Sequence, residues 1–296
     1  MTGKKMVIAG GTGLIGRALA THAHQHGYEV IVLSRRQTSI GVGGTVVWDG
    51  RTAGPWQDAL EDAQFVVNLC GASIGEGRWT AARKAEIRDS RLSTSRCLIE
   101  AVEAGGQRPK LLQASAIGFY GPGSETVDET SDAGNDYLSD LAVAWETEAN
   151  AYSGPMVLAR FGVVLDGSGG ALPRMALPFR IFCGGKLGSG NQWFSWVTLD
   201  DAVRAILFAL TESLNGPVNI VSPNPVTNGD LAHALGQALH RPALIPTPAW
   251  ALRMLLGEQA CLLLEGQRVV PTKLVSSGFV FKQPRIGAAL DALLNK

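Results

Sequence analysis

A glycine-rich turn near the start of the chain, Gly10–Gly16, constrains the fold more than any other stretch. The apolar run Met6–Ala9 before it predicts a short buried strand, and the apolar pattern after it predicts a helix that ends at Gly27. A second run rich in β-branched residues, 29–33, predicts another strand. A glycine turn at the first crossover of a strand–helix–strand unit is typical of dinucleotide-binding α/β proteins.

The spacing of the glycines indicates how a diphosphate would bind. The pattern is GxxGxxG. In such a turn Gly10 permits the tight bend, Gly13 lets the backbone approach a diphosphate, and Gly16 lets the helix pack close to the strand. Free N–H groups at the positive end of the helix dipole then hold the diphosphate. The predicted cofactor-binding residues of this turn are Gly10, Thr12, Gly13, Leu14, Ile15 and Gly16.

The end of the second predicted strand indicates which dinucleotide binds. An acidic residue there would bind the ribose hydroxyls of NAD, whereas an arginine accommodates the extra phosphate of NADP. This chain has Ser34, Arg35 and Arg36 at that point and no acid. Because guanidinium groups match phosphate bidentately, we expect NADP(H), bound through these three residues. The alternative is that the two arginines are only solvated surface residues.

The charge balance excludes several classes of partner. Lys+Arg and Asp+Glu are 26 each, which predicts neither a nucleic-acid partner nor an anionic membrane surface. No apolar run is long enough to span a bilayer, and the four scattered cysteines lack the spacing of metal ligands, so we expect no metal site. The chain starts directly with its first predicted strand, which leaves no room for a signal peptide, and we expect a cytoplasmic protein.

Further polar residues follow the later predicted strands. These are the apolar runs 65–72, 111–115 and 157–165. In a doubly wound sheet, ligands bind outside the carboxyl ends of the strands. Asn68, Gly71 and Ala72 are therefore expected beside the glycine turn, although each also fits a plain tight turn. Ser115 ends the next strand, and the loop after it could bring Tyr120 to the same place.

The chain is predicted to form an α/β fold with two parts. Residues 1–166 are expected to form a Rossmann-like, doubly wound parallel sheet, joined by the helix and strand of 198–222. Residues 167–296 are expected to form a smaller C-terminal α/β lobe, with a helix at 250–264 and a strand at 278–281. A long helix is predicted over 80–104, and many of its charges are expected to form a solvated face. Its basic residues are Arg83, Lys84, Arg88, Arg91 and Arg96.

Several of these stretches together resemble a known family. They are Gly10–Gly16, Asn68–Ala72, Ser115, Arg160–Leu165 and Ser195–Asp201. The chain resembles an extended (atypical) short-chain dehydrogenase/reductase, most closely the "epimerase family protein" subgroup of the NAD-dependent epimerase/dehydratase superfamily. Residues 248–258 and 278–281 resemble that subgroup's small C-terminal domain of unknown function. The resemblance implies Arg160 as a further cofactor-binding residue, and a homodimer formed through two helices of the large domain.

The chemistry of that family rests on serine, tyrosine and lysine, with the last two spaced as YxxxK. The lysine and the oxidised nicotinamide ring lower the pKa of the tyrosine, so that it can move a proton while hydride is transferred. Here the fourth residue after Tyr137 is Leu141, and no lysine occurs between 110 and 186. Ser115 is a candidate hydrogen-bond donor to a substrate oxygen, and Tyr120 and Tyr137 are candidates for proton transfer.

Two functions fit this sequence. The first is an NADP(H)-dependent oxidoreductase or epimerase that acts on a small molecule, such as a nucleotide sugar, held between the large domain and the lobe. The second is a sensor or scaffold that binds NADP(H), has lost catalysis and acts through a protein partner. Some members of the subgroup carry a cell-division label, which fits the second reading by association only.

Overall fold

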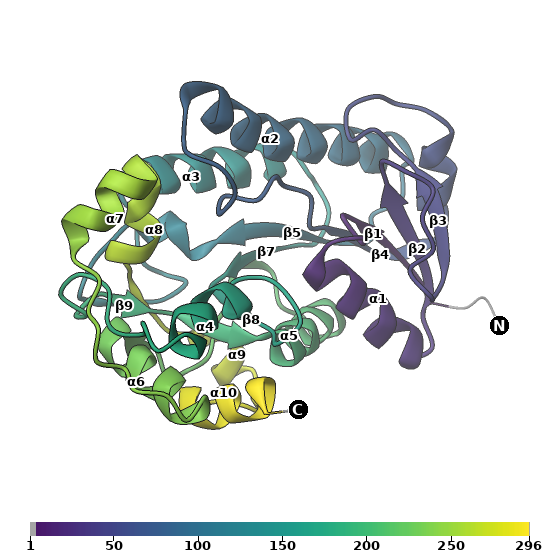
Figure 1. The fold of residues 1–296 in the computed structure, drawn as a ribbon. Helices are drawn as coiled ribbons and strands as arrows, with labels where there is room; N and C mark the ends of the chain where they lie inside the picture. Colours follow the sequence, from purple (N-terminus) through teal and green to yellow (C-terminus); the bar gives the residue numbers. More distant parts are fainter. Residues whose placement is uncertain (1–3, 296) are drawn as a thin grey trace.

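A seven-stranded parallel sheet forms the centre of the computed structural model, which describes residues 4–295 (Figure 1). Its strands are β1 (Lys5–Ala9), β2 (Glu29–Ser34), β3 (Gly44–Val47), β4 (Ala63–Asn68), β5 (Lys110–Ala116), β7 (Met156–Phe161) and β11 (Gly216–Ile220). Their order across the sheet is β3-β2-β1-β4-β5-β7-β11, and every neighbouring pair is parallel. The order reverses between β1 and β4, which is the switch point where ligands bind in such sheets.

Helices cover both faces of this sheet (Figure 1). One layer contains α1 (Leu14–Gln25) and α5 (Leu199–Thr211), and the other contains α2 (Ala81–Ala104) and α3 (Tyr137–Ala149). Side chains of β1 alternate between two apolar cores, since Met6 and Ile8 pack on the α1 side and Val7 and Ala9 on the α2 side. Burial on both faces explains why the strands read as continuous apolar runs. The predicted Rossmann-like, doubly wound sheet is confirmed.

A third apolar core lies among the helices below the sheet in Figure 1 and includes Leu165, Leu172, Trp196 and Leu290. Its main helices are α4 (Leu172–Arg180), α6 (Asn228–Ala238) and α10 (Ile286–Leu294). Six short strands form three two-stranded sheets, β8 with β10, β9 with β12 and β6 with β13. Their bounds are β6 (Thr126–Val127), β8 (Val163–Leu165), β9 (Trp193–Phe194), β10 (Trp196–Thr198), β12 (Val226–Thr227) and β13 (Arg268–Val269). The remaining helical segments are η1 (Pro55–Leu60), η2 (Ile117–Tyr120), α7 (Ala249–Leu256), η3 (Gly257–Ala260), α8 (Cys261–Leu264) and α9 (Thr272–Ser276).

Two predicted elements of the lobe differ from the structure. The helix expected at 250–264 is broken at Gly257, whose φ of 62° lies in the left-handed region. The strand expected at 278–281 is wrong, because this segment is irregular. Its apolar residues serve aromatic packing instead: Phe279 is buried between Phe208 of α5 and Phe281.

The boundary between the two parts is crossed more than once. The segment 198–222, expected to join the first domain, supplies α5 and the edge strand β11. The division of the chain at residue 166 stays a prediction. The outermost residues of the two predicted parts, 1–3 and 296, lie outside the described residues. From residue 4 to residue 295, no helix is both long and apolar enough to cross a membrane.

Candidate dinucleotide-binding site

Two glycines of the turn after β1 are required by contacts within the chain. Gly10 has a φ of 79°, and a Cβ there would lie 2.8 Å from the carbonyl carbon of Leu69. A Cβ on Gly16 would lie 2.6 Å from the Cα of Gly11 and closer still to the carbonyl oxygen of Gly10. These two positions therefore bring β1, the end of β4 and α1 into close approach, as their predicted roles require.

Gly13 is different, because nothing in the chain requires a glycine there. Its φ is −75°, and a Cβ would come no nearer than 3.4 Å to the carbonyl oxygen of Gly10. It is exposed and caps α1 without a side-chain hydrogen bond, and the first turn of α1 contains no acid. The amides of Leu14, Ile15 and Gly16 thus begin the helix without a side-chain cap, an arrangement that fits a diphosphate. The carbonyl oxygen of Thr12 accepts a hydrogen bond from Arg17 Nε at 2.8 Å.

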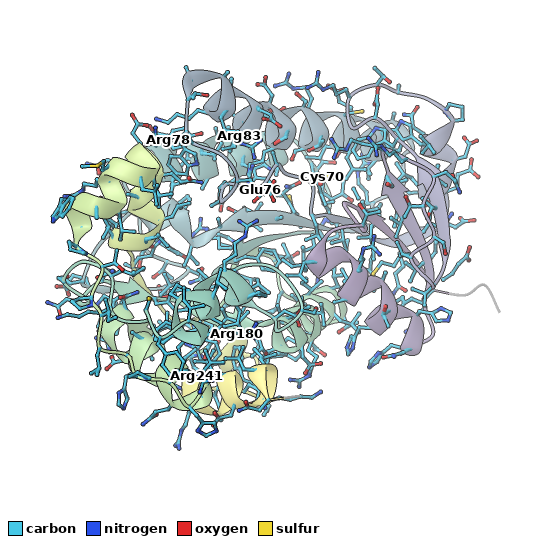
Figure 2. All side chains as sticks on the ribbon, viewed as in Figure 1. Cys70, Glu76, Arg78, Arg83, Arg180 and Arg241 are labelled. Atoms are coloured by element: carbon cyan, nitrogen blue, oxygen red, sulfur yellow. The ribbon has the colours of Figure 1, made fainter. Side chains whose placement is uncertain are left out.

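The end of β2 reaches the same edge of the sheet, formed by the carboxyl ends of the strands and called here the carboxyl edge. Arg35 and Arg36 are exposed, and neither forms an ion pair within residues 4–295. Ser34 accepts a backbone hydrogen bond from Trp48. Burial raises the pKa of the Cys70 thiol to about 12, and the nearby charge of Arg35 acts in the opposite direction. Cys70, which Figure 2 labels, follows the carboxyl end of β4.

The polar group at the end of β4 organises the loop rather than facing a ligand. Asn68 is fully buried, and its amide donates to Ser95 Oγ at 3.2 Å and to Gln113 Oε1 at 3.0 Å. Its Oδ1 accepts from the backbone N–H of Cys70 at 3.1 Å. Gly71 and Ala72 follow at the surface, and Ser90 Oγ accepts from the amide of Ala72. Contact of these residues with the dinucleotide stays a prediction.

Ser115 lies at the carboxyl edge, but its hydroxyl hydrogen is already engaged. Its Oγ donates to Glu146 Oε1 at 2.6 Å, and both residues are buried. A carboxylate can only accept, so the single hydrogen of Ser115 must point to it. In this geometry the hydroxyl of Ser115 can accept a hydrogen bond from a ligand, but it has no free hydrogen to donate to one. The flanking residues of β5, Ala114 and Ala116, carry no polar group.

Glu146 is held by Arg160 in a buried, bidentate ion pair. Arg160 Nε and Nη2 each lie 2.8 Å from a carboxylate oxygen of Glu146. Burial alone would lower the pKa of Arg160, but the hydrogen bonds and charge of Glu146 outweigh it and raise the pKa. The guanidinium also stacks on the ring of Phe119, with its Cζ 3.4 Å from the ring centroid. Arg160 is thus occupied by internal contacts, which favours a structural role over the predicted cofactor contact.

Tyr120 belongs to the same buried network. Its hydroxyl accepts from Arg160 Nη1 at 3.0 Å and donates to Asn219 Oδ1 of β11 at 2.7 Å. Burial raises the pKa of Tyr120, against the effect of the hydrogen bond from Arg160. Like Ser115, it has no free hydrogen to give to a substrate.

Tyr137 is the least committed of the three predicted catalytic residues. It opens α3, half-buried, with its ring edge-on to Trp79, and its hydroxyl lies 3.4 Å from the carbonyl oxygen of Lys84, a long contact. Burial raises its pKa, while the charges of Lys84, Arg91 and Arg88 act in the opposite direction. Lys84 of α2 lies over the ring of Tyr137, with its Nζ 4.7 Å from the ring centroid. Tyr137 is protonated at neutral pH, so it can give a proton more readily than take one.

The structure adds three residues that the sequence did not assign to the site, Glu146, Asn219 and Arg91. Glu146 and Asn219 hydrogen-bond to Ser115 and Tyr120, and nothing in their local sequence marks them. Arg91 belongs to a helix of which many charges were expected on a solvated face, but it is partly buried against Trp145. Among residues 4–295, no group of three His, Cys, Asp or Glu side chains could hold a metal ion.

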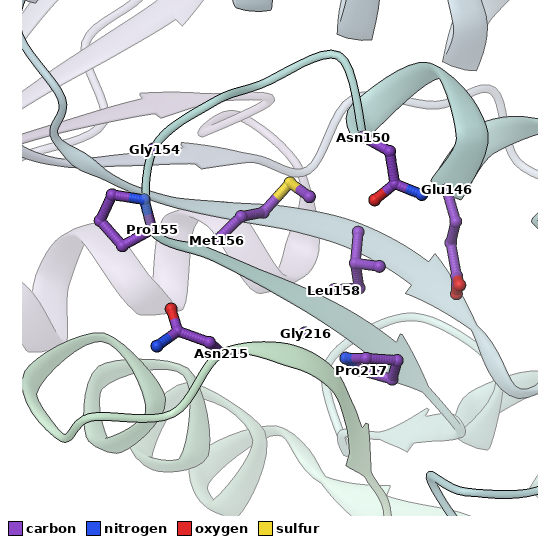
Figure 3. A pocket seen from close by; sticks show the side chains of 9 residues that line it. All are labelled: Glu146, Asn150, Gly154, Pro155, Met156, Leu158, Asn215, Gly216 and Pro217. Atoms are coloured by element: carbon purple, nitrogen blue, oxygen red, sulfur yellow. The ribbon is translucent and has the colours of Figure 1, made fainter.

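An open hollow of about 560 Å³ has Glu146 of the buried network at one end (Figure 3). It is lined mainly by the amino-terminal ends of β7 and β11 and the segments before them, including Pro155, Met156 and Asn215. Ligands of doubly wound sheets bind at the opposite ends of the strands. The candidate site is therefore the carboxyl edge at the glycine turn.

The strand order and the glycine turn at its switch point define a Rossmann-type dinucleotide-binding protein. Residues 6–221 match the NAD dependent epimerase/dehydratase family, and the chain belongs to this family. Residues 247–293 match a domain of unknown function, DUF1731. The resemblance read from the sequence is confirmed.

Relatives match over the whole chain. An epimerase family protein of Mycobacterium bovis is 40% identical over 296 residues, which cover 98% of this chain and 97% of the relative. The crystal structure of human epimerase family protein SDR39U1 with NADPH has a TM-score of 0.90 and 33% identity, covering 99% of both chains. A nucleoside-diphosphate sugar epimerase from Corynebacterium glutamicum has a TM-score of 0.79 and 32% identity, covering 98% of this chain and 58% of its own.

Proposed function

We propose that this protein is an NADP(H)-dependent oxidoreductase or epimerase that acts on a small molecule at the carboxyl edge. The observation that carries the choice of cofactor is the pair Arg35 and Arg36, exposed after β2 with no acidic residue beside them and no ion pair within residues 4–295. Their guanidinium groups suit the extra phosphate of NADP. The human relative solved with NADPH supports the same choice.

The side chains favour the direction of carbonyl reduction. Bound NADPH would supply a hydride, and the substrate oxygen then needs a proton. Tyr137 is protonated at neutral pH and has the least engaged hydroxyl, so it is the proposed donor. Ser115 would accept a hydrogen bond from the substrate, for example from a neighbouring hydroxyl, because its own hydrogen is bound to Glu146.

Titration of the purified protein with NADPH and NADH, read by cofactor fluorescence, tests the cofactor. We expect NADPH to bind more tightly, and the double variant Arg35→Ala/Arg36→Ala to weaken NADPH by about tenfold or more, since hydrogen bonds to charged groups contribute about 1.5–3 kcal/mol. NADH affinity should hardly change. Arg51→Ala, which removes an exposed arginine after β3, is the matched control. A preference for NADH would refute the assignment.

One observation favours a second candidate, a sensor or scaffold that binds NADP(H) without turnover. The hydroxyl hydrogens of Ser115 and Tyr120 are both engaged inside the protein, and α3 lacks the lysine of the family pattern. A screen of carbonyl compounds and nucleotide sugars with NADPH separates the two. Turnover that is lost in Tyr137→Phe supports the enzyme. Tight NADPH binding without turnover, together with a partner captured only when NADPH is present, supports the sensor.

A cytoplasmic location and a homodimer paired through two helices of the large domain stay predictions. Sedimentation velocity at several protein concentrations tests the dimer.

A further inference from the structure

Arg91 of α2 is a partly buried cation at the carboxyl edge without an acidic partner. Burial lowers its pKa to about 10. Three other arginines whose side chains are at most about a quarter exposed each pair with a carboxylate: Arg83 with Glu86, Arg160 with Glu146 and Arg204 with Asp201. Between residues 4 and 295, no carboxylate lies within ion-pair distance of Arg91. A desolvated charge without a partner is costly, so its retention points to an anion that arrives from outside.

The contacts of Arg91 fix the guanidinium while leaving part of it available. Nη1 donates to the carbonyl oxygens of Ala72 at 3.1 Å and Ile87 at 2.9 Å. The guanidinium also lies over the ring of Trp145, with its Cζ 5.0 Å from the ring centroid. Nε and Nη2 make no hydrogen bond to any described residue, yet neither is sealed off from solvent. A planar guanidinium held on one side and open on the other suits an oxyanion.

The position of the guanidinium is that of a ligand-binding residue. A Cβ on Gly71 would lie 3.2 Å from the Cζ of Arg91, so the absence of a side chain at this exposed residue leaves the guanidinium accessible. Two residues earlier, the backbone of Leu69 touches Gly10 of the glycine turn. Arg91 therefore stands beside the switch point between β1 and β4, where a doubly wound sheet binds its ligand.

We propose that Arg91 binds an oxyanion, a phosphate or a carboxylate, of the ligand that occupies the carboxyl edge. The group belongs either to the diphosphate of the dinucleotide or to an anionic substrate. The inference rests on the proposed function only for the place of the ligand.

Binding measurements on the full chain test this assignment with two probes. NADPH is titrated into the protein, and sodium oxalate is then titrated into protein saturated with NADP⁺, both by calorimetry. Arg91→Met keeps the apolar stem on Trp145 and removes the charge, and Arg91→Lys keeps the charge without the planar fork. Arg88→Met, one turn earlier on the exposed face of α2, is the matched control. Circular dichroism verifies that each variant is folded.

If the dinucleotide supplies the anion, Arg91→Met weakens NADPH by about tenfold or more, Arg91→Lys recovers part of the loss, and Arg88→Met binds like the wild type. If the substrate supplies it, NADPH affinity is unchanged, but oxalate binds the wild type and not Arg91→Met. Equal binding of both probes by wild type and Arg91→Met overturns the inference while the proposed function stands. If the wild type fails to bind NADPH, the proposed function fails, and oxalate binding to the free protein still decides the role of Arg91.

Discussion

At the scale of single residues, Gly13 and Gly16 of the turn can be separated by what a methyl group would meet at each position. A methyl group on Gly16 would collide with backbone atoms of Gly10 and Gly11. Gly13 faces no such obstacle, and its backbone conformation is open to any residue. Glycine at 16 is therefore required by the fold, whereas a need for glycine at 13 is a prediction that rests on the proposed diphosphate.

The variants Gly13→Ala and Gly16→Ala should consequently fail in different ways. Gly13→Ala should keep its free energy of unfolding within about 1 kcal/mol of the wild type, because alanine is only a poorer helix cap there. It should nevertheless weaken NADPH by about tenfold or more, because the methyl group fills the space of the diphosphate. Gly16→Ala should lose about 2 kcal/mol of stability through overpacking.

Urea unfolding and fluorescence titration with NADPH measure these two quantities separately. Each variant serves as the control of the other. Unchanged NADPH affinity in Gly13→Ala would mean that no diphosphate approaches this turn.

How far the site could be predicted depends on the distance along the chain between interacting residues. The glycine turn and Arg35–Arg36 could be predicted as candidate binding residues because each motif lies within a few consecutive residues. The partners of Ser115 and Tyr120 were not, since Glu146 follows Ser115 by 31 residues and Asn219 follows Tyr120 by 99. Only the folded sheet shows that the hydroxyl hydrogens at these positions are already bound.

At the scale of secondary-structure elements, the loop after β4 is held by helices from both parts of the chain. Arg83 of α2 donates to the carbonyl oxygen of Ser73 at 2.5 Å. From the C-terminal part, Gln259 of η3 donates to the carbonyl oxygen of Ile74 at 2.9 Å. In return Arg78, labelled in Figure 2, donates to carbonyl oxygens at the end of α7, including that of Met254 at 2.7 Å. The C-terminal helices thus help to position the loop after β4 at the carboxyl edge.

Removing the hydrogen bonds between the loop after β4 and the C-terminal helices should increase the local opening of both segments. In Arg78→Ala/Gln259→Ala we expect amide hydrogen exchange in 71–79 and 249–260 to rise about tenfold, because each lost hydrogen bond contributes about 1 kcal/mol. Exchange mass spectrometry without cofactor measures this. Arg108→Ala, in the loop between α2 and β5, removes a surface ion pair with Glu103 and is the control. If the double variant exchanges like the control, α7 and η3 do not hold the loop.

The sequence predicted the elements of the large sheet better than those of the lobe. Buried parallel strands are recognised in a sequence as continuous apolar runs, as at Met6–Ala9 and 111–115. The segment 278–281 gave a similar pattern, yet its aromatic residues pack on α5 without pairing to a strand. The backbone amides of Lys282 and Gln283 donate to the buried carboxylate of Asp201 instead. An apolar pattern in the sequence indicates that side chains are buried. It does not indicate whether the backbone has a neighbouring strand with which to form a sheet.

At the scale of the whole molecule, the two parts share structure at several places. The β13 strand of the C-terminal part pairs with β6 of the first part. Gln267 Nε2 donates to the carbonyl oxygen of Ile117, directly after β5, at 2.7 Å. The chain enters the lobe after β8, returns for α5 and β11, and leaves again. Such interleaving makes separate unfolding of either part costly, since each would expose the contacts of the other.

We therefore expect the protein to unfold as one cooperative unit that the dinucleotide stabilises throughout. Native-state hydrogen exchange at increasing urea should give the same opening free energy for amides of β4 and of α6. NADPH at 100 times its dissociation constant should raise both by about 2.7 kcal/mol, because a ligand that binds only the native state stabilises every part that unfolds with its site. Arg35→Ala/Arg36→Ala at the same NADPH concentration should show a smaller rise in both. An opening free energy for α6 that is lower than that of β4 and insensitive to NADPH would mean that the lobe unfolds by itself and senses the cofactor only through local contacts.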